Sequence, residues 1–251
     1  MGESQKIQVF IGQVNTAGDL DELGRIVDDM ARQLGFEYFA LGHHAKIFSD
    51  KLLHLSNYPT AWAEHFVTRY LSDDPAIAAC QNAIVGFLWS DIHRLIALTE
   101  RQKWFLAESR RAGLGEGFTV PIHLPGECAG SCNFVAVPGK NIPSSTLPAA
   151  QYAGCLAFEA ARRLVRTGNK HEGADPKQSA PHLSSRQLDC LVLAAQGKSD
   201  TDTGQLLGIS GQTVHQHIEA AKRRYGVATR AQLIVHALFH SQLAFEDVLP
   251  H

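Results

Sequence analysis

This sequence of 251 residues lacks three features: a cysteine framework, a long apolar run and a leader peptide. Of its five cysteines only Cys128 and Cys132 stand close together, and no histidine pair lies near them at a zinc-finger spacing. An odd, scattered set of cysteines is typical of a reducing compartment. No apolar run approaches the roughly 20 residues that a transmembrane helix needs, and the first residues, MGESQKIQVF, lack the basic-then-apolar order of a signal peptide. We therefore expect a cytoplasmic protein without a membrane partner.

Charge and catalytic motifs are also sparse. Charged residues make up 19% of the chain and the net charge is −2, which excludes an acidic tail protein and a broadly basic one. The glycine-rich GLGEG at 113–117 follows a predicted helix and precedes a strand, the reverse of a dinucleotide-binding loop. His43 and His44 are better explained as strand surface and core than as metal ligands. The sequence therefore predicts no catalytic residue, no metal and no cofactor.

Apolar residues make up 45% of the chain, which is enough for substantial cores. The stretch 166–182, RTGNKHEGADPKQSAPH, is polar and has almost no apolar side chain, as is typical of a linker between domains. We predict one domain over 1–167, a linker over 168–182 and a second domain over 183–251.

The first domain mixes helix and strand signals. Apolar residues repeat at helical spacing over 20–34, and Gly35 follows as a C-terminal cap. Further expected helices cover 60–72, 99–111 and 148–166, and expected strands cover 37–44, 51–56, 85–89, 117–123 and 132–138. The element order αββααβαββα, with strands close together, predicts an α+β fold: an α-β-α sandwich with a central antiparallel sheet and helices on both faces.

The second domain has helix signals throughout. Expected helices cover 184–196, 200–207, 211–225 and 229–239, with GKS, GIS and GVA between them. Four short helices with tight turns predict an all-α, four-helix helix-turn-helix domain. In the third helix polar side chains come first and cations last, which suits docking in the major groove of double-stranded DNA. The predicted DNA-binding residues are Gln212, Thr213, His215, Gln216, Glu219, Lys222 and Arg223.

The charge of the second domain permits another interpretation. From Leu183 to His251, six Lys and Arg balance six Asp and Glu, as a helical module that binds protein could also do. The charges are segregated, however, because the stretch 220–230 carries four cations and no acidic residue. This segregation favours phosphate contacts and hence DNA binding.

The second domain resembles the LuxR-type helix-turn-helix of bacterial transcription factors over about 65 residues. The matching residues are Leu183, Arg186, Leu191, Gly197-Lys198-Ser199, Leu207-Gly208-Ile209-Ser210, Thr213-Val214, His217 and Gly226. Two positions depart from the family pattern. Gln187 replaces the usual Glu, which argues against a buried ion pair at this position. Thr203-Gly204 replaces the usual Ile-Ala. The glycine weakens its helix by about 1 kcal/mol relative to alanine.

An aromatic stripe in the first domain ends in a carboxylate. Tyr58, Trp62, Phe66, Tyr70 and Asp74 each stand four residues after the last. Aromatic residues at this spacing usually form a core ridge. A buried carboxylate without donors costs several kcal/mol, whereas Tyr and Trp supply O–H and N–H donors. The alternative is therefore an apolar cavity with one acceptor and a few donors, the layout of a small-molecule site.

Most of residues 15–165 resemble the autoinducer-binding domain of LuxR-type quorum-sensing regulators. The matches are Asn57-Tyr58-Pro59, Trp62, Asp74-Pro75, Trp89 and Gly117 in the run GFTVP. The resemblance implies an N-acyl homoserine lactone ligand, with Trp62 donating to the lactone carbonyl, Asp74 accepting the amide N–H and Tyr58 donating to the acyl carbonyl. It also implies that Trp89 and Phe105 line the lactone end. The predicted ligand-binding residues are Tyr58, Trp62, Phe66, Asp74, Trp89, Phe105, Ser131 and Asn133.

The two domains together predict a transcriptional regulator in which the lactone stabilises the fold and favours a homodimer on DNA. The helix over 148–166 is the expected dimer surface, because it directly precedes the linker. Three alternatives remain: a regulator that answers another signal or none, an enzyme that processes acyl lactones, and a regulator that has lost DNA binding and acts through heterodimers. Retention of Tyr58, Trp62 and Asp74 favours the lactone.

Overall fold

The computed structural model describes residues 3–44, 53–63, 73–168 and 181–249 of the chain. Contacts between residues group the chain into two compact units. The N-terminal unit comprises residues 1–123 and 128–174, and the C-terminal unit comprises residues 124–127 and 175–251. No helix within the described ranges is long and apolar enough to cross a membrane.

A five-stranded antiparallel sheet forms the centre of the N-terminal unit. Its strands are β1 (Tyr38–His43), β2 (His54–Ser56), β3 (Phe87–Leu88), β4 (Gly117–Ile122) and β5 (Gly130–Val135). Their order in the sheet is β2-β1-β5-β4-β3. The register places Asn133 of β5 between Ala40 of β1 and Thr119 of β4. Side chains of the central strand β5 therefore neighbour side chains of both β1 and β4.

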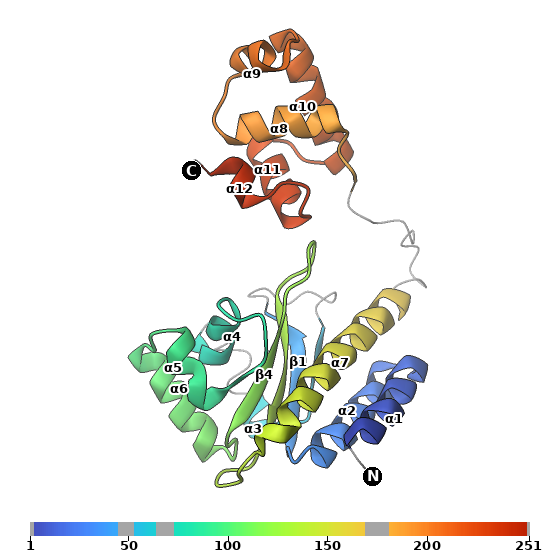
Figure 1. Cartoon of the computed structure of the whole chain (residues 1–251), viewed down its shortest axis with the longest axis vertical. Helices are drawn as coiled ribbons and strands as arrows, with labels where there is room; N and C mark the ends of the chain where they lie inside the picture. Colours follow the sequence, from blue (N-terminus) through green and yellow to red (C-terminus); the bar gives the residue numbers. More distant parts are fainter. Residues whose placement is uncertain (1–2, 45–52, 64–72, 169–180, 250–251) are drawn as a thin grey trace. The chain divides into compact units, whose positions relative to one another are not determined.

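Helices cover both faces of this sheet (Figure 1). One group consists of α1 (Glu3–Thr16), α2 (Leu20–Gln33) and α7 (Leu147–Gly168), and the other of α4 (Pro75–Cys80), α5 (Ile92–Leu95) and α6 (Glu100–Arg111). The predicted α-β-α sandwich with a central antiparallel sheet is confirmed. A single described turn, α3 (Thr60–Trp62), follows β2.

Strand alternation divides the side chains between the two faces of the sheet. Phe39, Cys132 and Phe134 are buried on the face covered by α2 and α7, where Gly154 of α7 lies directly against Cys132. The residues between them, including Ser131 and Asn133, point to the opposite face. One face thus forms an apolar core, and the other carries polar side chains toward α4–α6.

Several predicted elements differ from the structure. The helix α1 was not predicted, although its buried Phe10 and Val14 stand at helical spacing. The strand predicted over 85–89 is only β3, because Trp89 begins a short 3-10 helix, Trp89–Asp91. Strand β5 begins two residues before the predicted start. The strand predicted over 51–56 is described only from residue 53, and the helix predicted over 60–72 only to residue 63; the rest lies outside the described residues.

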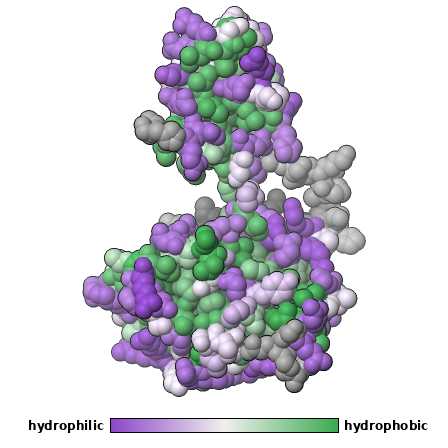
Figure 2. All heavy atoms as spheres, in the orientation of Figure 1, coloured by the Kyte–Doolittle hydropathy of each residue, from purple (hydrophilic) through white to green (hydrophobic). Residues whose placement is uncertain are grey.

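The C-terminal unit is helical. Its elements are α8 (Ser185–Ala195), α9 (Asp200–Leu207), α10 (Gly211–Tyr225), α11 (Arg230–Phe239) and a short α12 (Phe245–Val248), which was not predicted. Ser184, Ser199, Ser210 and Thr229 cap the first four helices, each accepting a backbone N–H. Their shared core contains Leu191, Val214, Ile218, Leu233 and Ala237. Figure 2 shows hydrophilic side chains around an apolar area on this unit.

Candidate functional site

One cavity of the N-terminal unit brings the predicted ligand-binding residues together. It encloses about 80 Å³ beside the polar face of the sheet. Seven of the eight predicted residues line it: Tyr58, Trp62, Asp74, Trp89, Phe105, Ser131 and Asn133. The eighth, Phe66, lies outside the described residues, as does Tyr70. The lining also includes Ala40, Leu41, Gly42, His43, His44, His54 and Ile77, which the sequence did not identify as ligand contacts.

Aromatic rings form one end of this cavity, called here the aromatic end. The Trp62 side chain is only 3% exposed, and its ring lies edge-on to Phe105 with 5.2 Å between centroids. Val135 belongs to the same buried cluster, with Tyr58 and Trp89 packed against it. This end offers large apolar surfaces to a compact ring on a ligand.

Asp74 is an acceptor with a second, structural task. It is the N-cap of α4, and its Oδ1 accepts the Ala76 N–H at 2.8 Å, so Pro75 occupies the first helical position. Burial raises the pKa of Asp74 to about 6, although backbone hydrogen bonds from Ala76 and Ile77 oppose this shift. Burial and the nearby Asp74 raise the pKa of Tyr58 well above its usual value. At neutral pH the cavity therefore holds a carboxylate acceptor beside a phenol donor.

A relay of hydrogen bonds crosses the sheet from Trp89 to His44. Trp89 Nε1 donates to Thr119 Oγ1 at 2.9 Å, and Thr119 Oγ1 donates to Asn133 Oδ1 at 2.6 Å. Asn133 Nδ2 donates to Ser131 Oγ at 3.1 Å, and Ser131 Oγ lies 2.9 Å from His44 Nε2. No ligand-binding role was predicted for Thr119 or His44. Strand alternation could have placed Thr119 on this face of the sheet. The contact of His44 with Ser131 could be predicted only from the pairing of β1 with β5.

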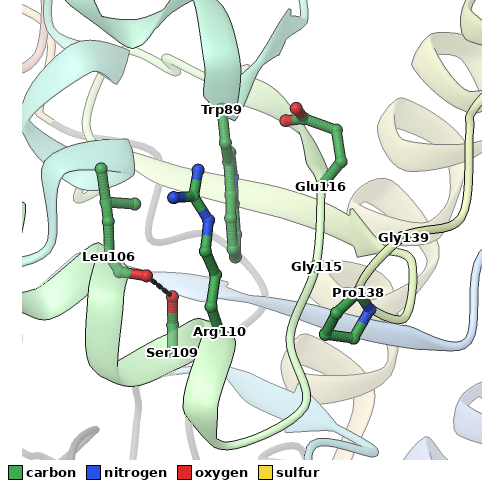
Figure 3. Close-up of a pocket in the computed structure, with 8 residues that line it drawn as sticks. All are labelled: Trp89, Leu106, Ser109, Arg110, Gly115, Glu116, Pro138 and Gly139. Atoms are coloured by element: carbon green, nitrogen blue, oxygen red, sulfur yellow. Dashed lines mark hydrogen bonds between the residues drawn. The ribbon is translucent and has the colours of Figure 1, made fainter.

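Trp89 also lines a second pocket (Figure 3). This pocket measures about 210 Å³ and is lined by Trp89, Leu106, Ser109, Arg110, Gly115, Glu116, Pro138 and Gly139. Figure 3 shows the Arg110 side chain alongside the Trp89 ring. Glu116 Oε1 accepts the backbone N–H groups of Ser90 and Gly117 at 3.0 and 3.2 Å. The Trp89 ring is therefore part of the wall of both hollows.

Two histidines of the cavity, His44 and His54, are neutral at physiological pH. Burial, followed by the influence of His123 and His43, lowers the pKa of His44 to about 4. Burial also lowers the pKa of His54. Among the described residues, no group of three or more His, Cys, Asp or Glu side chains could hold a metal ion.

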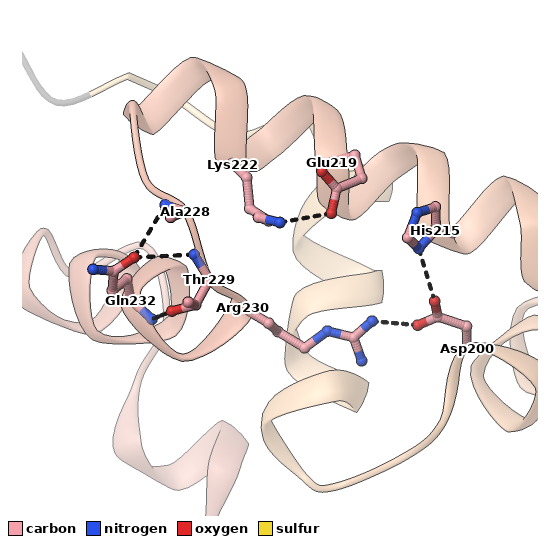
Figure 4. A network of polar contacts seen from close by, with 8 residues as sticks. All are labelled: Asp200, His215, Glu219, Lys222, Ala228, Thr229, Arg230 and Gln232. Carbon is pink, nitrogen blue, oxygen red and sulfur yellow. Dashed lines mark hydrogen bonds and ion pairs between the residues drawn. The ribbon is translucent and has the colours of Figure 1, made fainter.

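The predicted DNA-binding residues all lie on α10, and their availability differs. Gln212, His215, Gln216 and Arg223 are exposed, whereas Thr213, Glu219 and Lys222 are partly buried. Figure 4 shows Lys222 donating to Glu219 at 2.7 Å, and Asp200 of α9 between His215 and Arg230. Lys222 lowers the pKa of Glu219 and keeps it charged. Exposed polar groups therefore stand both in the first half of α10, at Gln212 and Gln216, and near its end, at Arg223.

The two departures from the helix-turn-helix pattern have structural explanations. Gln187 is 5% exposed, and its Oε1 accepts from Arg224 Nη1 at 3.2 Å, so a charged hydrogen bond stands where the family pattern implies an ion pair. Arg224 also donates to the His182 carbonyl at 2.6 Å and so ties the end of α10 to the segment before α8. A Cβ on Gly204 would lie 2.6 Å from the Ile209 oxygen. The glycine therefore lets α9 pack closely against the turn that leads into α10.

Comparisons with known families agree with both units. Residues 19–164 match the family described as "Autoinducer binding domain", and residues 181–237 match "Bacterial regulatory proteins, luxR family". This chain belongs to the LuxR-type regulators. The predicted resemblance is thereby confirmed, and this family consists of transcriptional regulators rather than enzymes. Its ligands are autoinducers of the acyl homoserine lactone type, and the family indicates no cofactor.

Individual relatives of this LuxR-type regulator align along most of its length. The transcriptional activator protein AnoR of Acinetobacter nosocomialis is 25% identical over 87% of this chain and 90% of its own. The transcriptional activator protein LuxR of Aliivibrio fischeri is 26% identical over 91% of each chain. The fold is similar to that of Escherichia coli SdiA, with a TM-score of 0.64, 21% identity, and coverage of 95% of this chain and 98% of SdiA. SdiA has also been solved in complex with octanoyl-rac-glycerol (TM-score 0.57, 20% identity, 93% of each chain).

Proposed function

We propose that this regulator binds an N-acyl homoserine lactone in the sheet cavity, dimerises, and binds DNA through α10. The observation that supports this proposal best is the convergence of Tyr58, Trp62 and Asp74 on one cavity. In the proposed complex Trp62 donates to the lactone carbonyl, Asp74 accepts the ligand amide N–H, and Tyr58 donates to the acyl carbonyl. Each ligand group then meets a protein group of opposite hydrogen-bonding sense.

Thermal unfolding with a panel of acyl homoserine lactones of different chain lengths tests the ligand. A lactone at 100 times its dissociation constant stabilises the protein by about 2.7 kcal/mol, which shifts the unfolding temperature by several degrees for a domain of this size. An octanoyl glycerol belongs in the panel. A shift with the glycerol ester alone would refute the lactone head group, and no shift with any compound would refute an acyl ligand altogether.

Matched substitutions test the residue roles. Trp62→Phe removes the buried N–H, whereas Trp104→Phe makes the same change on a ring that is 46% exposed on α6. Asp74→Asn removes the acceptor charge but keeps a capping oxygen, and the neighbouring Asp73→Asn removes a charge that pairs with Arg101. We expect Trp62→Phe and Asp74→Asn each to weaken lactone binding roughly tenfold, since a charged or buried hydrogen bond contributes about 1.5 kcal/mol. Equal effects in each pair would contradict the assignment.

The DNA-binding surface consists of the exposed side of α10. Gln212 and Gln216 present amides that can pair with adenine, while Arg223 is available to a phosphate. Replacing Arg223 by Ala should weaken binding to all sequences and reduce the salt dependence by about one phosphate contact. Gln216→Ala should instead relax sequence preference at one base pair. Arg94→Ala, which removes an exposed cation from the N-terminal unit, should change neither quantity.

The dimer surface is proposed on α7, whose Tyr152 side chain is 49% exposed. A two-fold dimer would present two copies of α10 to two half-sites. Sedimentation of wild type and Tyr152→Asp with and without lactone tests the dimer; a monomer at every concentration would refute it.

The proposed boundaries are 1–167 for the ligand domain, 168–182 for the linker and 183–251 for the DNA-binding domain, and the proposed location is the cytoplasm.

A further inference from the structure

His44 is held at the end of the cavity that lies away from the aromatic end. Its backbone N–H donates to the Ala129 carbonyl at 2.7 Å, which extends the pairing of β1 with β5 beyond the end of β1. Its ring nitrogen Nε2 lies 2.9 Å from Ser131 Oγ. Backbone and side chain are therefore both fixed, and the imidazole ring lines the cavity in one orientation.

The direction of the hydrogen-bond relay favours one tautomer of His44. Trp89 can only donate, so Thr119 accepts from it and passes its own hydrogen to Asn133 Oδ1. Asn133 then donates from Nδ2 to Ser131 Oγ. The Ser131 oxygen has a second lone pair and the 2.9 Å contact fits either tautomer of His44, and we assign the one in which Ser131 donates its single hydrogen to His44 Nε2 because the relay then continues in one direction. A neutral imidazole that accepts at Nε2 carries its hydrogen at Nδ1.

This Nδ1–H group has no partner among the described residues. The nitrogen is buried, and no hydrogen bond reaches it. Burial and two neighbouring histidines, His43 and His123, keep the ring neutral, so the group remains a single donor over the physiological range. A buried donor without an acceptor is unfavourable, and in a ligand cavity an acceptor on the ligand would satisfy it.

The position of this donor relative to the aromatic end indicates which part of a ligand it meets. Val135 belongs to the aromatic end, and Ser131 stands four residues earlier on the same strand. At the usual rise of a strand this separation is roughly 13 Å, with Asn133 halfway. A ligand whose head ring packs against Trp62 and Phe105 would therefore direct its acyl chain, not its head, toward His44.

We infer that His44 is a specificity-determining residue that donates from Nδ1 to a keto or hydroxyl oxygen on the acyl chain of the signal. The ligand class of this regulator is accordingly an oxygen-substituted acyl homoserine lactone rather than an unsubstituted one. This inference rests on the proposed lactone-binding function and adds to it the chemistry of the acyl chain.

Titration of the full-length protein with matched lactones tests the inference. The probes have equal chain length and are unsubstituted, 3-oxo, 3-hydroxy, or hydroxylated nearer the end of the tail. We expect one oxygenated probe to bind about tenfold more tightly than the unsubstituted probe, the usual effect of one added hydrogen bond in a buried site. Equal affinity for all four probes would overturn the inference and leave the proposed lactone function standing. Failure of every lactone to bind would overturn both.

Substitutions assign the preference to His44. His44→Phe keeps a ring of similar shape but removes the donor, so it should abolish the preference by weakening only the oxygenated probe. Ser131→Ala, which frees His44 to adopt the other tautomer, should reduce the preference and serves if His44→Phe does not fold. His93→Phe is the matched control, because His93 is exposed and does not line the cavity. An equal loss of affinity for substituted and unsubstituted probes in both variants would show a merely structural role and overturn the inference.

Discussion

Replacing Gly117 by Ala should damage the ligand cavity through a single methyl group. Gly117 begins β4, and a Cβ built there would lie 2.3 Å from Cε2 and 2.5 Å from Cδ2 of Trp89. Carbon atoms in favourable contact are about 3.5–4.0 Å apart. The indole must therefore move by roughly 1 Å or more, away from β4 and toward Arg110, which lies along its other face (Figure 3).

The magnitude follows from what Trp89 would lose. Adding a methyl group to a packed site usually costs about 1–3 kcal/mol. Displacement of the ring also breaks the 2.9 Å hydrogen bond from Nε1 to Thr119, a further cost of about 1 kcal/mol. A loss of about 2–4 kcal/mol corresponds to a fall of roughly 4–16 °C in the unfolding temperature of a domain of this size. Lactone affinity should fall by more than tenfold as well, because Trp89 starts the relay and lines the cavity.

Calorimetry of the wild type and three variants separates these contributions. Gly12→Ala is the matched control: no atom lies within 4 Å of its added Cβ in α1, and alanine should stabilise that helix by about 0.5–1 kcal/mol. Trp89→Phe leaves Gly117 in place and reports the loss of the N–H donor together with the smaller ring. If Gly117→Ala unfolds within about 2 °C of wild type and binds lactone equally well, the ring moves freely and the reasoning about a fixed wall is refuted.

Two further predictions concern Asp74 and Gly204. The pKa of Asp74 is about 6 in the free protein. Because the ligand amide N–H favours the charged carboxylate, binding stabilises deprotonated Asp74. Lactone affinity should therefore be constant above about pH 6 and fall below it. Asp74→Asn should bind more weakly but without this pH dependence in a titration from about pH 5 to 7, and a parallel pH profile would contradict the role. Gly204→Ala should destabilise the C-terminal unit by about 1–3 kcal/mol in urea unfolding and weaken DNA binding, because its Cβ would push the Ile209 carbonyl before α10. Helix propensity alone predicts stabilisation by about 1 kcal/mol, so the sign of the change decides between packing and propensity.

Local patterns in the sequence were sufficient to predict most of the helices and strands. Thr99, Ser184 and Thr229 were readable as starts of helices because a short polar side chain precedes each helical repeat, and all three cap their helices. Strands β4 and β5 were predicted from their own residues. Helix α1 was predictable as well, because Phe10 and Val14 stand at helical spacing in the sequence.

The candidate site depended on information that local patterns do not contain. Spacing places Tyr58, Trp62 and Asp74 on one stripe, but Asp74 proves to be the cap of a separate helix, α4. Only the family resemblance predicted that these residues share a site with Trp89 and Ser131. His44 could not be found in this way, because its contact with Ser131 depends on the register between β1 and β5, strands about 90 residues apart in sequence.

The departure at Gln187 does not argue for a regulator that has lost its DNA-binding fold. The Gln187 side chain is 5% exposed, so a glutamate there would have to be desolvated before it could gain from Arg224. The neutral amide avoids that cost, and its single oxygen still accepts from Arg224 and from the Ser184 backbone N–H at 3.0 Å. Since Arg224 is the last residue but one of α10, the same contact that an ion pair would make continues to hold α8 and α10 together. The exposed start of α10 is therefore presented on an intact scaffold, which favours DNA binding by this chain over a role through heterodimers alone.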